Sequence, residues 1–143
     1  MVMLLAACGG GNGVSKDEYR TELAKISKDA GAAHAEIEQN APSATTIAQL
    51  QTVLRQFAAA EDRIGDEVSR LKVPDDAKAA NAELARGEHD DADEIRVLLP
   101  KLAKYKSVQQ AFGVLQRLGG SKGGREGDDA LAKLKQLGYA SGS

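Results

Sequence analysis

Residues 46–72, which read TIAQLQTVLRQFAAAEDRIGDEVSRLK, carry the pattern that decides the fold. Apolar side chains recur there at steps of three and four, and Glu61 takes one of the apolar places. The other members of this stripe are Ile47, Leu50, Leu54, Phe57, Ile64, Val68 and Leu71. A repeat of that period places them on one face of an α-helix. The stretch therefore predicts a long amphipathic helix that begins near Ser43 or Thr46 and buries one face.

The same period is found upstream of this helix. Ser15 and Glu18 have the spacing of a capping box, which predicts the start of a first helix. Pro42 is expected to end that helix, because the residue before a proline avoids the helical conformation. Its apolar stripe consists of Tyr19, Leu23, Ile26, Ala30, Ala33 or His34, and Ile37.

Downstream, Pro74 suits the first turn of a third helix, and Pro100 is expected to kink or stop it. The stripe of this helix contains polar and small residues: Ala77, Ala80, Leu84, Gly87, Asp91, Ile95, Leu98 and Leu102. Ser107 can cap a shorter fourth helix. Residues 119–127, GGSKGGREG, are expected to form a flexible loop.

The chain is expected to end in a short fifth helical piece. Asp128 or Asp129 can cap it, and Gly138 is placed to terminate it in the left-handed conformation with Tyr139 folding back. Short links between amphipathic helices favour antiparallel neighbours. The sequence thus predicts an all-α fold, an antiparallel up-down four-helix bundle with its last element split, over residues 15–139. Residues 140–143 form a tail.

Composition excludes several classes of function. A net charge of −2 is unlike that of nucleic-acid-binding proteins, and the absence of tryptophan argues against an aromatic cage or base-stacking platform. Acidic residues dominate 61–94 and basic ones 95–143. An acidic helix face beside a basic one in the bundle explains this, and so does a bipolar surface for a charged partner.

The amino-terminal residues Leu5-Ala6-Ala7-Cys8 resemble the lipobox of bacterial lipoproteins. The resemblance implies that the thiol of Cys8 receives a diacylglyceryl group and that a peptidase cuts before it. Only seven residues precede Cys8, so residues 1–7 are expected to be the remnant of a signal peptide that starts further upstream. Residues 8–14, rich in glycine, would then form a flexible tether.

This resemblance implies a location and a partner. Two or more acyl chains hold a protein on a bilayer, so the expected site is the extracytoplasmic side of a bacterial envelope membrane. Membrane lipid would be one partner, through acylated Cys8, and an unidentified protein another. The favoured function is a binding or structural module without enzymatic activity and without a cofactor.

Polar residues on the core stripes are the candidates for a ligand site in the domain, because unpartnered polar groups are costly to bury. They are His34, Glu61, Asn81 and Asp91. Antiparallel folding at Pro42 and Pro74 predicts Glu61 opposite Glu88 and near Asp91. It also predicts His34 near Leu50, away from both carboxylates.

The stretch GEHDDADE, residues 87–94, adds His89 and Asp93 one helical turn apart. Glu61, His89, Asp91, Asp93 and His34 together form the alternative hypothesis, a sensor for a metal ion or a small ligand. The sequence lacks a Glu-x-x-His pair, and this stretch lacks the oxygen spacing of a calcium loop, so no metal ligands are assigned. A hydrolase is a third class, without a nucleophile motif to support it.

Overall fold

The computed structural model describes residues 14–118 and 120–140, and these contain helices and turns but no strand. The elements are α1 (Lys16–Asn40), η1 (Ala41–Ser43), α2 (Ile47–Ser69), η2 (Asp75–Ala77), α3 (Lys78–Leu102), α4 (Val108–Leu118) and α5 (Lys122–Gln136). The predicted all-α class is confirmed. The lipobox-like residues 5–8 and the tether expected up to residue 13 lie outside the described residues.

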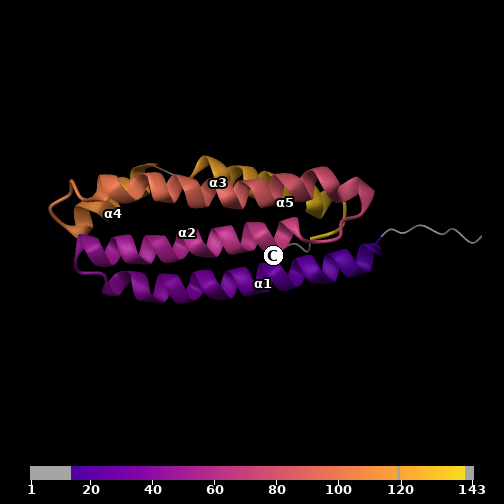
Figure 1. Ribbon diagram of the computed structural model, residues 1–143, viewed down its shortest axis with the longest axis horizontal. Helices are drawn as coiled ribbons and strands as arrows, with labels where there is room; N and C mark the ends of the chain where they lie inside the picture. The colour runs from indigo at the N-terminus through magenta and orange to yellow at the C-terminus, as the bar shows by residue number, and fades with distance from the viewer. Residues whose placement is uncertain (1–13, 119, 141–143) are drawn as a thin grey trace, which may run out of the picture.

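The helices form an elongated bundle (Figure 1). Three long antiparallel arms, α1, α2 and α3, lie in chain order, with α2 in contact with both neighbours. The last arm is divided: α4 lies at the end where α1 turns into α2, and α5 packs along α3. α3 ends at Leu102, two residues after Pro100, as the position of that proline predicts.

Capping boxes start both of the first two long helices: the predicted one at Ser15 and a second one, at Thr46, that was not predicted as a box. The hydroxyl of Ser15 accepts the backbone N–H of Glu18 at 3.1 Å, and the Ser15 N–H donates to the Glu18 carboxylate at 3.0 Å. Thr46 and Gln49 repeat this exchange at the start of α2, at 3.2 and 3.1 Å. Of the two starts predicted for the second helix, Thr46 is therefore its cap. Each box satisfies two amides that a helix start leaves without partners.

The buried apolar residues form two clusters. The larger one joins the start of α1, the end of α2 and parts of α3 and α5, and consists of Tyr19, Leu23, Ile26, Ile64, Val68, Ala77, Ala80, Leu84, Ala85, Ala130, Leu134 and Tyr139. The smaller one, at the α1–α2 turn, contains Ala44, Leu50, Leu102 and Ala111. Glu61, a buried charged residue, belongs to neither cluster, whereas the buried polar residue Asn81 is bonded to Tyr19 and Val68 of the larger one.

The last helix ends as predicted, with Gly138 in the left-handed conformation and Tyr139 folding back. Gly138 has φ +78°, which a residue with a side chain rarely adopts, and the N–H of Tyr139 returns to the Leu134 carbonyl at 2.8 Å. The Tyr139 ring then meets the Tyr19 ring edge-on, with centroids 5.2 Å apart. This contact ties the end of the chain to α1.

The flexible loop predicted for residues 119–127 is wrong for residues 122–127, which form the first turns of α5. Ser121, and not Asp128 or Asp129, is the cap, and its hydroxyl accepts the N–H of Gly124 at 2.8 Å. The glycines are needed for packing. A Cβ added to Gly123 would lie 2.3 Å from the backbone nitrogen of Asp91.

The same close approach continues along α3. A Cβ added to Gly87 would lie 2.6 Å from the backbone nitrogen of Gly127. Real Cβ atoms do not come this close to backbone, so the two helices lie together only because both carry glycine at these positions. Glu83 of α3 also pairs with Lys133 of α5 across this interface.

We predict that Gly123→Ala destabilises the fold by about 1–3 kcal/mol, the usual cost of overpacking a tight contact. Gly31→Ala is the matched control, because Gly31 is an exposed residue of α1 with nothing within 4 Å of an added Cβ. That control is expected to gain up to about 1 kcal/mol from helix propensity. Urea denaturation followed by circular dichroism measures the free energy of unfolding of both variants. Equal stability of the two variants would contradict the packing role of Gly123.

Candidate functional site

Two of the predicted site residues meet in the middle of the bundle. Nε2 of His34, on α1, lies 2.8 Å from Oε1 of Glu61, on α2, and Glu61 is only 2% exposed. The acceptor is not in line with an Nε2–H bond, so the contact is a close ion pair and not a well-directed hydrogen bond. The His34 ring stacks on Phe57 at 4.8 Å between centroids. This places the imidazole edge against the buried carboxylate.

The predicted position of His34 near Leu50 is therefore wrong. The turn between α1 and α2 includes η1 and three further residues, 44–46, before α2 begins. This longer link shifts the pairing of the two helices toward the carboxyl half of α2. His34 consequently joins Glu61 instead of lying apart from it.

Glu88 of α3 approaches Glu61 from the other side, as folding at Pro74 predicts. Burial, together with the hydrogen bond and negative charge of Glu61, raises the pKa of Glu88 to about 9. At neutral pH Glu88 is therefore protonated, and its O–H can donate to the Glu61 carboxylate. The two acids share one negative charge.

The charge that remains belongs to Glu61. Burial alone would raise the pKa of Glu61, but the contacts with His34 and Glu88 outweigh it and lower that pKa. The contact with Glu61 in turn raises the pKa of His34, against the effect of burial. A row of three side chains from α1, α2 and α3, His34, Glu61 and Glu88, thus crosses the bundle. We call these three residues the buried row.

Asp91 lies one turn beyond Glu88 on α3 and adjoins the buried row. Burial raises its pKa, and the negative charges of Glu61 and Glu94 act in the same direction. A hydrogen bond with Ser121 opposes this shift. Asp91 therefore binds its proton more tightly than an ordinary aspartate does.

His89 and Asp93 do not join this group. Nδ1 of His89 lies 3.1 Å from Asp62 of α2, and Asp93 pairs with Arg96 at 2.9 Å. Arg96 also contacts Asp62, so these side chains form a half-exposed ion network on the α2–α3 surface. The structure therefore separates the five candidates into His34, Glu61 and Asp91 on one side and His89 and Asp93 on the other. Residues 14–118 and 120–140 contain no group of three or more His, Cys, Asp or Glu side chains arranged to hold a metal ion.

Asn81, the fourth polar residue of the core stripes, has a structural role. Its carboxamide oxygen accepts the Tyr19 hydroxyl at 2.9 Å, and its nitrogen donates to the Val68 carbonyl at 3.1 Å. These bonds link α3 to α1 and to α2. Because both ends of the buried amide have partners, Asn81 is not a candidate for ligand binding.

A groove of about 1140 Å³ adjoins the buried row. It lies among α2, α3 and the start of α5, and Phe57 and Asp91 line it. Apolar side chains form part of its wall: Leu54, Phe57, Ile95, Val97 and Leu98. The rest of the wall consists of the uncharged residues Gly120, Ser121 and Gly124 and of charged residues: Asp90, Asp91, Asp93, Glu94, Lys122, Arg125 and Asp128.

Glu94 builds the wall of this groove and was not among the predicted residues. Its two carboxylate oxygens accept the backbone N–H groups of Lys122 and Gly123 at 3.0 and 3.1 Å. A carboxylate at this point also complements the positive end of the α5 dipole. No local signal reveals this role, because the residues that Glu94 caps lie 28 and 29 positions further along the chain.

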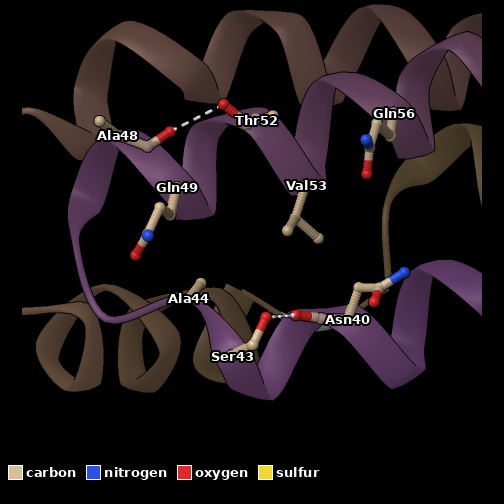
Figure 2. Close-up of a pocket in the computed structure, with 8 residues that line it drawn as sticks. All are labelled: Asn40, Ser43, Ala44, Ala48, Gln49, Thr52, Val53 and Gln56. Carbon is tan, nitrogen blue, oxygen red and sulfur yellow. Dashed lines mark hydrogen bonds between the residues drawn. The ribbon is translucent and has the colours of Figure 1, made fainter.

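A second hollow of about 390 Å³ lies at the α1–α2 turn (Figure 2). Its lining is uncharged: Asn40, Ser43, Ala44, Ala48, Gln49, Thr52, Val53 and Gln56. Several of these side chains are already used locally. Ser43 donates to the Asn40 carbonyl at 2.6 Å, Thr52 to the Ala48 carbonyl at 3.0 Å, and Gln49 completes the α2 capping box. The groove beside the buried row therefore offers more chemistry to a ligand.

Comparison with known proteins adds no relative: no family model, curated protein or solved structure matches this chain. A search for membrane-spanning segments covered the described helices. None of them combines the length and the hydropathy that crossing a bilayer requires.

We predict that the buried row makes stability fall as pH rises above neutrality. The pKa of Glu88 in the folded protein, about 9, exceeds its ordinary value of 4.5, so folding binds a proton between these pH values. The stabilisation is complete below 4.5 and is lost as pH rises through 9. The pKa of His34 is also raised, so its contribution to stability is likewise lost as the pH rises above its ordinary pKa of 6.5.

Glu88→Gln tests this prediction, because glutamine keeps a neutral hydrogen-bond donor and cannot ionise. Its urea midpoint is expected to fall less than that of the wild type between about pH 6 and 9. Glu22→Gln, at an exposed position on α1, is the control and should follow the wild type. If the urea midpoints of wild type and Glu88→Gln changed with pH in the same way, the assignment of the proton to Glu88 would be contradicted.

Proposed function

We propose that this chain is a lipid-anchored, non-enzymatic binding module on the extracytoplasmic side of a bacterial membrane. The observation that carries the proposal is the lipobox-like sequence Leu5-Ala6-Ala7-Cys8, which contains the single cysteine of the chain. Acyl chains on that cysteine would supply the membrane attachment, at about 0.8 kcal/mol for each buried methylene.

The order of segments along the chain supports this proposal. Residues 9–13 contain four glycines, a composition typical of linkers, and α1 begins shortly afterwards at Lys16 with its own capping box. The helical domain then closes on itself through Tyr19 and Tyr139. The contacts of Tyr19 and Tyr139 thus tie together the two ends of the described domain, and the proposed attachment site at Cys8 precedes that domain in the sequence.

The chemistry of the domain supports binding over catalysis. His34 lies beside the Glu61 carboxylate, and Glu88, which keeps its proton at neutral pH, donates a hydrogen bond to Glu61. Glu94 caps α5. The acids and the histidine with the most unusual surroundings therefore have structural partners already. The groove beside them is open and largely apolar, which favours the capture of a small ligand.

Replacement of Cys8 tests the anchor. The gene is expressed in a bacterium from its genomic locus, as wild type and as Cys8→Ala. The wild type is expected in the membrane fraction, with the mass of acyl groups on its amino-terminal peptide, and the variant is expected to lose both. Gly11→Ala, a change in the same segment outside the lipobox, should behave as the wild type.

Two results would overturn the proposal. One is a wild-type protein that fractionates as soluble with an unmodified Cys8 thiol. The other is a Cys8→Ala protein that stays in the membrane fraction as fully as the wild type. Extraction of the membrane fraction with carbonate separates acyl anchoring from loose association.

A further inference from the structure

We propose that the groove among α2, α3 and the start of α5 binds a small apolar cation, such as a hydrophobic amine or a quaternary ammonium compound, with Asp91 as its main counter-charge. The inference deepens the proposed function, since it names the ligand class of the binding module. It concerns the folded domain alone, so it is tested without reference to the anchor at Cys8.

The apolar side of the groove supplies contact area. Leu54 and Phe57 come from α2, and Ile95, Val97 and Leu98 come from α3. Val97 is 58% exposed, an unusual state for a large aliphatic side chain in this protein. The volume of about 1140 Å³ accommodates a ligand of drug-like size, for which pockets of roughly 300–1000 Å³ are typical. An apolar body on the ligand would remove this surface from water.

The charged side of the groove is selective for positive charge, because its two cations are engaged elsewhere. Lys122 pairs with Glu126 at 3.4 Å, and Arg125 donates to the Gly120 carbonyl. Two of the five acids are engaged as well, Asp93 with Arg96 and Glu94 with the first amides of α5.

Three carboxylates of the groove remain: Asp90, Asp91 and Asp128. Among the side chains that the structure describes, none of the three has a lysine, arginine or histidine nitrogen within 4 Å. The groove thus joins an apolar wall to an excess of uncompensated negative charge. This combination fits a ligand with a cationic head and an apolar body, and it disfavours an anion.

Asp91 is the best placed of these three to hold the ligand. It lines the groove and adjoins the buried row, and Ser121, which lowers its pKa, lines the groove as well. The charged groups that act on it are Glu61 from α2, Glu94 from α3 and His34 from α1. The carboxylates and burial raise its pKa above the ordinary 3.8, whereas a bound cation favours the ionised form. Binding should therefore release a proton and weaken as pH falls from neutral toward that raised pKa.

A pair of ions with one shape and opposite charge provides the test. Tetraphenylphosphonium and tetraphenylborate are each titrated into the full 143-residue chain, kept reduced, and binding is followed by calorimetry. The phosphonium cation is expected to bind at least about tenfold more tightly than the borate anion. Its affinity is expected to be lower at about pH 4.5 than at pH 7.

Variants locate the site. Asp91→Asn is expected to lower the affinity for the cation roughly three- to tenfold, which is the effect of losing one partly buried charge pair. Asp128→Asn and Val97→Ala change exposed side chains of the groove and should therefore keep the fold. Each is expected to weaken binding of the cation as well. Glu22→Gln, a change of equal charge on α1, should leave the affinity unchanged.

Three outcomes would overturn the proposal. The first is equal binding of both ions, which indicates apolar adsorption alone, and the second is no binding of the cation below millimolar concentration. The third is an unchanged affinity for the cation in Asp91→Asn and Asp128→Asn. None of them bears on acylation of Cys8, and a soluble wild-type protein would not alter the binding result. The two proposals therefore fail separately.

Discussion

The contact between α3 and α5 at three glycines is the constraint on which the rest of the structure depends. Gly87 faces the backbone of Gly127, and Gly123 faces the backbone of Asp91, both at distances that leave no room for a side chain. This contact fixes where α5 lies. It brings Ser121 and Lys122 to the edge of α3, where they complete the groove, and it carries Leu134 and Tyr139 into the core beside α1.

Close helix packing in turn determines what happens to the polar residues in the middle of the bundle. An isolated carboxylate as buried as Glu61 would be very costly to ionise. On one side of Glu61 lies His34, whose pKa the carboxylate raises, and on the other side lies the protonated Glu88. Each of the three groups comes from a different helix, so their electrostatics couple α1, α2 and α3. The His34 ring also stacks on Phe57, which adds an apolar contact between α1 and α2.

Local patterns in the sequence were sufficient for several of the helix ends, but not for the start of α5. The Ser15 and Thr46 capping boxes, the stop after Pro100 and the left-handed Gly138 each depend on residues a few positions apart, and the structure has all of them. The all-α class follows from the 3.6-residue period of the apolar stripes.

Features that depend on residues far apart in the chain could not be predicted from local sequence patterns. Residues 122–127 have the composition of a loop, because glycine is a poor helix former, yet packing against Gly87 overrides that preference. The position of His34 relative to Glu61 depends on how many residues the α1–α2 turn uses, which a proline does not specify. The Glu94 cap joins groups far apart in the sequence. In the site, the pairing of Glu61 with Glu88 was predictable, whereas the groove became apparent only once α5 was placed.

The groove and the proposed anchor also make physical sense together. An apolar cation partitions into the interfacial region of a membrane, and anionic lipids raise its concentration near the surface. A module held there by an acyl chain would meet such a ligand at a higher local concentration than a freely diffusing protein would. The acidic side of the groove would be repelled by an anionic surface within about one Debye length, roughly 8 Å at physiological ionic strength. If residues 9–13 act as the proposed glycine-rich tether, they would relieve that repulsion, because the groove would stand beyond the screened layer while remaining close to the source of its ligand.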